Sequence, residues 1–189
     1  MSNFTNEHLG WRAAIVLNAN GEFIGRDGSS KSISNDSDRA LLFELRSQSD
    51  VIVTTGKTAR SEQYQSSKFA PIAFITRNPE SLRNIPAFMV PGDFPNRILT
   101  SKNHDLNWLP DQIRELGFSR PLFEGGPDSL NQLIDSGVAI EIFASSTAPV
   151  QPQETQLDLL AKLIPSISNF EVADVLEKES LRALRLIRP

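Results

Sequence analysis

Three places in the sequence put glycine, hydroxyl or charged side chains directly after an apolar run, a combination that suits phosphate binding. The first reads TTGKT over residues 54–58. Gly56 would let an anion approach the backbone, Lys57 supplies positive charge, and Thr58 supplies a hydroxyl where a helix is expected to begin. The P-loop of nucleotide triphosphatases is a rival interpretation, but that loop needs a glycine where this chain has Val51. A plain turn with a capping threonine also remains open.

The second place reads LFEGGPDSL over residues 122–130. Gly125 and Gly126 lack Cβ atoms where a pyrophosphate would have to come close, and Pro127 suits the first turn of a helix. Glu124 stands at the tip of the expected strand, where its carboxylate would face a ligand cleft. The competing interpretation is a tight strand-to-helix turn with a solvated glutamate.

The third place is the pair Thr76 and Arg77, which follows another apolar run. A hydroxyl and a guanidinium at a strand end suit the 2′-phosphate that distinguishes NADPH from NADH. A surface arginine after a strand is the competing interpretation. In open α/β sheets, ligands lie beyond the carboxyl ends of the strands, so all three places would meet at one edge of the sheet.

The elements that must position these residues alternate along the chain. Apolar runs predict strands at 12–19, 50–55, 71–76, 87–90, 97–100, 121–123 and 139–145. Helical spacing and capping residues predict helices from Asp36 or Ser37 to 46, after 56, and at 106–116, 128–136 and 157–164. Two final strands, 170–177 and 181–187, are expected to form an antiparallel hairpin at the sheet edge. The pattern predicts an α/β fold, a three-layer α/β/α sandwich whose sheet is mostly parallel.

Composition limits the classes of function. A chain of 189 residues predicts a single domain over 1–189, in which 1–10 form a loose lead-in. The net charge of −4 offers no global attraction to nucleic acid or to an anionic membrane. There is no cysteine, and His8 and His104 lack metal-ligand spacing, so no metal is expected. Without a signal peptide or a long apolar run, the expected location is the cytoplasm.

The order and spacing of several segments resemble the reductase domain of the bacterial riboflavin-biosynthesis deaminase-reductase, a family with the dihydrofolate-reductase-like fold. The matching segments are 32–35, 38–39, 45–46, 50–58, 122–127 and 136–137. The resemblance implies NADPH as the cofactor, no metal, and a homodimer. It also implies a small pyrimidine-type substrate, because the family reduces the ribosyl group of 5-amino-6-(5-phosphoribosylamino)uracil to ribityl.

The resemblance and the motifs together assign roles to individual residues. Expected cofactor contacts are Val16, Thr55, Gly56, Lys57, Thr58, Glu62, Thr76, Arg77, Gly125, Gly126, Pro127, Asp128, Ser129 and Leu130. Expected substrate contacts are Ser30, Arg46 and Glu124. No catalytic residue is assigned, and Glu124 and Asn20 are the candidates. Arg46 has an equal alternative, which is to stabilise the C-terminal end of its helix through the helix dipole.

The chain also departs from the family pattern. Asn20 stands where the family usually has an aspartate, so any acid–base role there is lost. The family's substrate-side segment carries a phosphate-binding arginine, whereas residues 63–68 offer Lys68 alone, with Arg60 nearby. Three hypotheses therefore stay open: an NADPH-dependent pyrimidine reductase, a non-catalytic nucleotide-binding protein of the same fold, and a reductase of another small compound.

Overall fold

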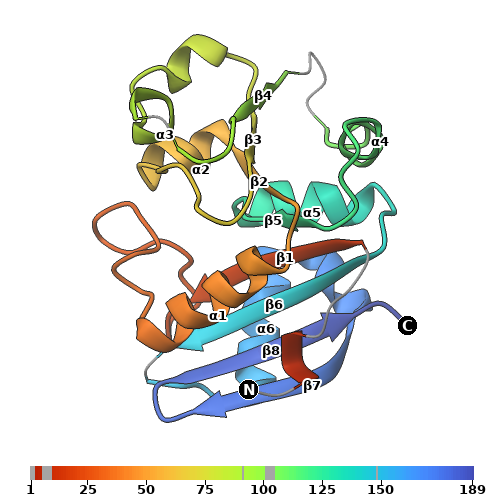
Figure 1. Cartoon of the computed structure of the whole chain (residues 1–189). Coiled ribbons are helices and arrows are strands. Elements are labelled where there is room, and N and C mark those ends of the chain that lie inside the picture. Colours follow the sequence, from red (N-terminus) through yellow and green to blue (C-terminus); the bar gives the residue numbers. More distant parts are fainter. Residues whose placement is uncertain (1–2, 6–9, 91, 101–104, 148) are drawn as a thin grey trace.

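The computed structural model describes residues 3–5, 10–90, 92–100, 105–147 and 149–189 (Figure 1). Its centre is an eight-stranded sheet in the order β4-β3-β2-β5-β1-β6-β8-β7. The strands are β1 (Trp11–Leu17), β2 (Val51–Thr55), β3 (Ile72–Ile75), β4 (Arg97–Leu99), β5 (Pro121–Phe123), β6 (Ile140–Thr147), β7 (Glu171–Lys178) and β8 (Leu181–Ile187). β1 to β6 pair in parallel, and β8 pairs antiparallel with both β6 and β7. The predicted mostly parallel sheet with an antiparallel C-terminal hairpin is confirmed.

Helices cover both faces of this sheet. They are α1 (Asp36–Ser47), α2 (Gly56–Ser61), α3 (Pro86–Met89), α4 (Leu109–Glu115), α5 (Pro127–Asp135) and α6 (Gln153–Leu163), with 3-10 turns at Asn3–Thr5, Pro79–Leu82 and Pro165–Asn169. Leu45 of α1 packs with Leu122, and Ala59 of α2 packs with Ile52. Because Ile52 and Leu122 are neighbours in register, α1 and α2 share one face. α4, α5 and α6 pack on the other face, so the three-layer sandwich is confirmed.

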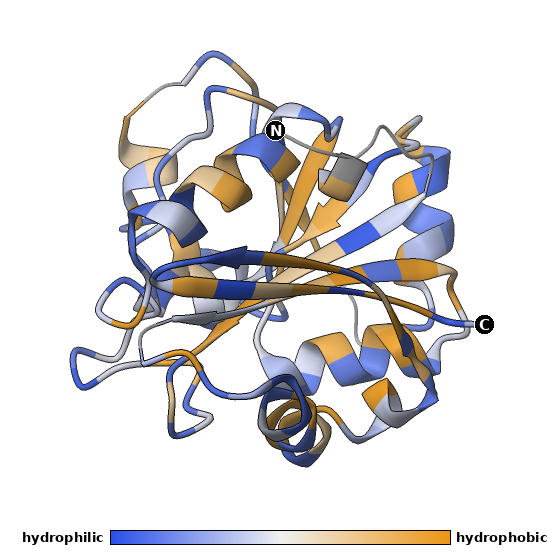
Figure 2. Cartoon of the chain, turned by 90° about the horizontal axis from the view of Figure 1, so that it is seen from below, coloured by the Kyte–Doolittle hydropathy of each residue, from blue (hydrophilic) through white to orange (hydrophobic). Residues whose placement is uncertain are grey.

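Burial on both faces explains why the strands were readable as apolar runs. The central strands are mainly hydrophobic, whereas the helices alternate hydrophobic and hydrophilic residues (Figure 2). In β2, all four residues from Val51 to Thr54 are 0% exposed. Within the part of the chain that the structure describes, no helix has the length and apolar character needed to span a membrane.

Four local expectations were wrong. Of residues 87–90, predicted as a strand, 87–89 belong instead to the short helix α3, which Pro86 begins because its fixed φ suits the first helical position. α6 starts at Gln153, four residues before the predicted start. The cap of α1 is Asn35, whose side chain accepts from the Asp38 backbone N–H at 3.0 Å, rather than residue 36 or 37. In the expected loose lead-in, Phe4 is 3% exposed and packs edge-on against Phe143.

The free edge of the C-terminal hairpin is β7. Glu171, Asp174, Glu177 and Lys178 are spaced along it, and its register with β8 shifts between Val172 and Asp174. Charges and an irregularity on an edge strand discourage pairing with another chain.

Candidate active site

A cavity of about 1110 Å³ lies where β1, β2, β3 and β5 end, between α1, α2 and α5. This volume slightly exceeds the usual range of roughly 300–1,000 Å³ for small-molecule sites and leaves room for a cofactor and a small substrate together. The predicted residues that line it are Val16, Ser30, Arg46, Thr55, Gly56, Lys57, Thr58, Glu62, Thr76, Arg77, Glu124, Gly125, Gly126, Pro127, Asp128 and Ser129. Two predicted residues do not line it. Leu130 is 0% exposed in the core, and Asn20 is exposed in the turn after β1, where its N–H donates to Asn18.

The start of α2 is built by a threonine cap. Thr55 Oγ1 accepts from the Thr58 backbone N–H at 3.2 Å and lies 3.0 Å from the Thr58 hydroxyl. A Cβ on Gly56 would lie 3.0 Å from the Thr76 side chain, so a larger residue would crowd the contact between α2 and the end of β3. Thr55 therefore caps α2, as the capping interpretation of the segment 54–58 expected. Residues 55–58 of the same segment also line the cavity.

The two glycines after β5 differ in the space that surrounds them. A Cβ on Gly125 would lie 2.4 Å from Cζ of Phe123, so that ring occupies the space a side chain would need. A Cβ on Gly126 would have no neighbour nearer than 3.8 Å, and that neighbour is Phe23, which also lines the cavity. Gly125 is therefore required by core packing, and Gly126 leaves open space on the cavity side.

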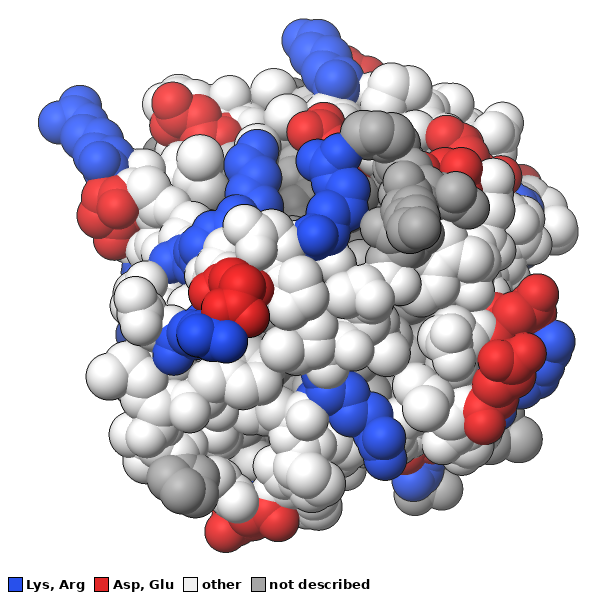
Figure 3. Space-filling model, turned by 90° about the horizontal axis from the view of Figure 1, so that it is seen from above, with Lys and Arg blue, Asp and Glu red and all other residues white. Residues whose placement is uncertain are grey.

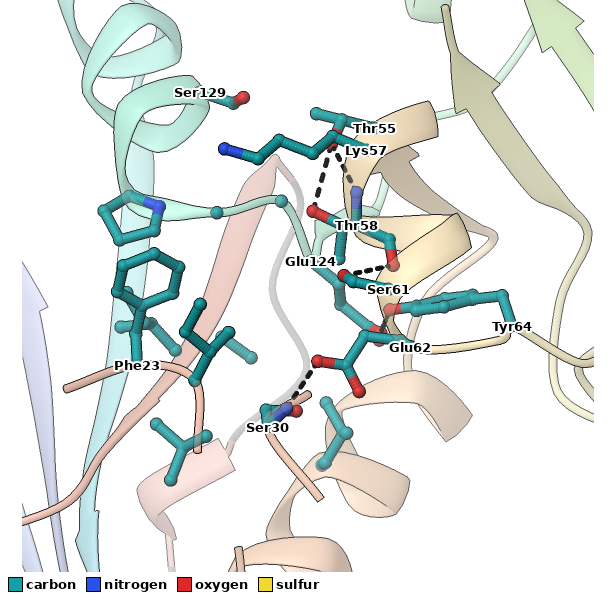
Figure 4. Close-up of a pocket in the computed structure, with 18 of the residues that line it drawn as sticks. Phe23, Ser30, Thr55, Lys57, Thr58, Ser61, Glu62, Tyr64, Glu124 and Ser129 are labelled. Carbon is teal, nitrogen blue, oxygen red and sulfur yellow. Dashed lines mark hydrogen bonds between the residues drawn. The ribbon is translucent and has the colours of Figure 1, made fainter. Parts of the chain in front are cut away.

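Lys57 extends from α2 across the cavity toward the first turn of α5, which carries Ser129 (Figure 4). With the described residues Lys57 makes no hydrogen bond or ion pair, and its side chain is exposed. An ammonium group thus stands between the N-terminal ends of two helices, both of which favour anions.

The wall between the two helices contains a buried charged group. Glu124 is 7% exposed, and both of its carboxylate oxygens accept from Arg46, from Nε at 2.7 Å and from Nη2 at 2.5 Å. The Tyr64 hydroxyl donates to the same carboxylate at 2.5 Å. Arg46 therefore pairs with Glu124 rather than acting as a helix cap. The sequence analysis missed Tyr64, since nothing in the local pattern around α2 indicates a partner 60 residues away.

This arrangement shifts two pKa values. Burial alone would lower the pKa of Arg46, but the charge and hydrogen bonds of Glu124 outweigh it and raise that pKa. Burial, and then the neighbouring carboxylate of Glu124, raise the pKa of the Tyr64 hydroxyl well above its usual 10.0. The Tyr64 phenol beside the Arg46–Glu124 ion pair is therefore neutral at neutral pH.

Tyr64 is the chain's sole tyrosine, which makes its titration directly visible. The native state holds this proton more tightly than the unfolded chain. The contribution of Tyr64 to the free energy of unfolding is therefore fully present below pH 10.0 and decreases as the pH rises above it. We expect the ultraviolet absorbance of tyrosinate to appear in the unfolded protein near pH 10.0 and in the native protein only at higher pH. The Tyr64→Phe variant should lose this tyrosine-linked fall in stability. Tyrosinate forming at the same pH in both states would contradict the geometry.

Glu62 ties a loop to α2. One of its carboxylate oxygens accepts from the Ser30 backbone N–H at 2.6 Å (Figure 4). Lys31 Nζ donates to the Glu62 backbone carbonyl at 2.8 Å. Both Glu62 and Ser30 line the cavity. Glu62, expected to contact the cofactor, therefore also positions the loop that carries the expected substrate contact Ser30.

Asp38 is a second buried carboxyl group on the cavity wall, to which the sequence analysis assigned no role. It is 8% exposed, and the Ser34 hydroxyl donates to it at 2.6 Å. Burial raises its pKa, against the opposing effect of hydrogen bonds from Ser34 and Ser145. Ser145 is the register partner of Val16, so Asp38 lies close to the expected nicotinamide position.

No group of acidic, histidine or cysteine side chains in the described ranges could hold a metal ion. His8 and His104 lie outside those ranges. The face shown in Figure 3 carries Lys and Arg side chains interspersed with Asp and Glu, without a continuous basic surface.

Comparison with known proteins supports the fold. No family model matches the sequence, and no curated protein matches it at the level of sequence. A pyrimidine reductase-like protein from Corynebacterium diphtheriae superposes with a TM-score of 0.69 at 16% identity, covering 99% of this chain and 94% of that one. Dihydrofolate reductase from Enterococcus faecalis, complexed with NADP(H) and RAB-propyl, gives 0.58 at 11% identity, covering 95% and 96%.

A diaminohydroxyphosphoribosylaminopyrimidine deaminase/5-amino-6-(5-phosphoribosylamino)uracil reductase from Thermotoga maritima gives a TM-score of 0.67 at 14% identity. The match covers 95% of this chain but spans 56% of the length of that protein. The chain thus has the dihydrofolate-reductase-like fold, and its structural neighbours include pyrimidine reductase-like proteins.

Proposed function

We propose that this chain is an NADPH-dependent reductase that acts on a small pyrimidine-type substrate, similar to the uracil reductase of riboflavin biosynthesis. The observation that carries the proposal is the open space beside Gly126, in the cavity that Lys57 also lines, where the ammonium of Lys57 has no ion-pair partner among the described residues. The likeness in fold to reductases of pyrimidine-type compounds supports it.

The residues present fit a dinucleotide. Gly126 leaves room for a pyrophosphate, Lys57 supplies charge, and the hydroxyls of Thr58 and Ser129 line the same part of the cavity. Arg77, on the loop after β3, would hold the 2′-phosphate. The cofactor would supply a hydride, which reduces a carbon atom of the substrate.

The chain's own residues would position the cofactor and the substrate and would supply a proton to the substrate. Val16 lies beside Ser145 in the sheet and would border the nicotinamide. The bonds from Arg46 and Tyr64 to Glu124 fix one wall of the site. A substrate that gains a hydride on carbon must also gain a proton on its neighbouring nitrogen or oxygen. Asp38, whose pKa is raised by burial, is better suited to deliver that proton than Glu124, which is held by Arg46 and Tyr64.

Arg77→Ala is expected to weaken NADPH binding about tenfold while leaving NADH binding nearly unchanged, because a guanidinium–phosphate contact is charge-assisted. Calorimetric titration with each cofactor measures the two affinities. The matched control is Arg83→Ala, which removes another exposed arginine that pairs with Glu80 and does not line the cavity. Equal weakening of both cofactors by Arg77→Ala would place the 2′-phosphate elsewhere.

The reaction itself is tested by following the loss of reduced nicotinamide absorbance with a panel of pyrimidine and pterin compounds. Oxidation of NADPH that depends on a pyrimidine supports the proposal. Binding without oxidation would favour the second candidate, a non-catalytic nucleotide-binding protein, which Asn20 in the place of an aspartate motivates. Oxidation with a different heterocycle alone would favour a reductase of another compound. The single domain over 1–189, the homodimer and the cytoplasmic location remain predictions, and light scattering tests the dimer.

A further inference from the structure

The cavity lining includes an aromatic side chain to which the sequence analysis assigned no role. Trp108 stands directly before α4, and its half-buried ring lines the cavity. Resting on the proposed function, we infer that the adenine of the bound NADPH stacks on the Trp108 ring. Trp108 is then a determinant of cofactor affinity that makes no contact with a phosphate.

Trp108 belongs to the end of the cavity where the 2′-phosphate is expected. β3 and β4 pair in parallel, with Ile75 opposite Leu99, so both strands end at the same edge of the sheet. Arg77 follows β3 in the chain, Trp108 follows β4, and both line the cavity. Ile75, Leu99 and Trp108 also pack against one core cluster. Because NADPH carries its adenine and its 2′-phosphate on adjacent carbon atoms of one ribose, a phosphate held at Arg77 leaves the adenine on this side of the cavity.

The order of the strands excludes the nicotinamide from the same place. The nicotinamide is expected beside Val16 of β1, and the order β4-β3-β2-β5-β1 puts β1 and β4 four strand spacings apart, or about 19 Å at about 4.8 Å per spacing. Gly126, where the pyrophosphate is proposed, follows β5 and so lies between the two ends. An extended dinucleotide laid across these strand ends therefore brings its adenine to Trp108.

The Trp108 ring is held in place by its own turn. Its Nε1 donates to the Asp105 carbonyl at 3.1 Å, and the Leu109 backbone N–H donates to the Leu106 carbonyl at 3.0 Å. Leu106 and Leu109 are buried on either side of it. The one polar group of the indole is thus satisfied without a ligand, and the ring offers the cavity its carbon surface. A rigid aromatic surface of this kind loses little conformational entropy when a nucleobase stacks on it.

The test uses adenosine 2′,5′-bisphosphate, which carries the adenine and the 2′-phosphate of NADPH but no nicotinamide. Calorimetry measures its affinity and that of NADPH. Trp108→Leu keeps an apolar side chain at this position and should weaken both ligands about tenfold, the loss expected for one stacked base. Trp108→Phe keeps a ring and should recover most of the affinity. The control is Phe118→Leu, because Phe118 is also half-buried and follows α4 but does not line the cavity.

Fluorescence separates stacking from a purely structural role of Trp108. The chain has two tryptophans, and Trp11 is 6% exposed at the start of β1, away from the strand ends that form the cavity. In Trp11→Phe, Trp108 is the one remaining indole. Saturation with the bisphosphate should then quench its emission, at the affinity that calorimetry gives. In Trp108→Leu, the emission of Trp11 should stay constant.

Three results would overturn the inference: native affinity for both ligands in Trp108→Leu, constant emission of Trp11→Phe at saturating bisphosphate, or binding of NADPH without binding of the bisphosphate at millimolar concentration. Failure of the proposed function looks different, because the native chain would then not bind NADPH at all. Thermal unfolding of Trp108→Leu and Trp108→Phe checks that both variants are folded.

Discussion

Replacing Gly126 by valine is expected to weaken NADPH binding about a hundredfold while the protein remains folded. The backbone here has φ −70° and ψ 171°, which a valine adopts without strain, and its Cβ would meet nothing nearer than 3.8 Å. The branched side chain would instead fill the space proposed for the pyrophosphate. If the pyrophosphate is displaced and loses two charge-assisted hydrogen bonds to the protein, the cost is roughly 3 kcal/mol, or about a hundredfold in affinity. Titration of cofactor fluorescence measures the loss, and thermal unfolding checks the fold.

Gly125→Ala is the matched control, because it changes the adjacent glycine with the opposite expected outcome. Its Cβ would collide with the Phe123 ring, whose Cζ would be 2.4 Å away, and overpacking of this kind costs about 1–3 kcal/mol. The alanine variant should therefore lose stability more than affinity. If Gly126→Val bound NADPH like the native chain, the pyrophosphate would not lie beside Gly126.

Arg46→Met is expected to destabilise the protein by about 3–5 kcal/mol, because it leaves the buried Glu124 carboxylate without its cation. The Arg46 side chain is 20% exposed and that of Glu124 is 6% exposed, so water cannot fully replace the lost partner. Urea denaturation measures the effect. Adding Glu124→Gln to the same chain should recover part of the loss, since no buried charge then remains, and the double-mutant cycle gives the coupling between the two residues.

The control for this prediction is the exposed pair of Arg114 and Asp111, whose side chains are 76% and 67% exposed. Arg114→Met should change the free energy of unfolding by at most about 1 kcal/mol, as is usual for surface ion pairs. A loss in Arg46→Met no larger than this would mean that the Glu124 carboxylate is well solvated, in disagreement with the structure.

Much of the fold was predictable because strands that are buried on both faces appear in the sequence as continuous apolar runs. β2 and β5 are examples, and each is followed by a glycine-bearing turn into a helix. The error at residues 87–90 has a physical cause. Four apolar residues suit a strand or one turn of helix equally well, and Pro86, together with the packing of Ala87 in the cluster around Phe74, decides for the helix.

The candidate site was predictable where its residues follow strand ends, and not where they depend on distant contacts. Tyr64 and Arg46 meet Glu124 across 60 and 78 positions of sequence, which no local pattern reveals. The space around Gly125 and Gly126 differs because the Phe123 ring lies against Gly125, which no local pattern reveals either. Asn20 was a candidate because of its position after the first strand, but its turn directs it away from the cavity lining.

Titration of the native protein with NADPH, followed by the fluorescence of the reduced nicotinamide, tests the central claim most directly. We predict saturable binding of one NADPH per chain, with NADH bound more weakly and with the NADPH affinity reduced about a hundredfold in Gly126→Val. Unchanged fluorescence up to millimolar NADPH, with no stabilisation of the protein against heating, would contradict it.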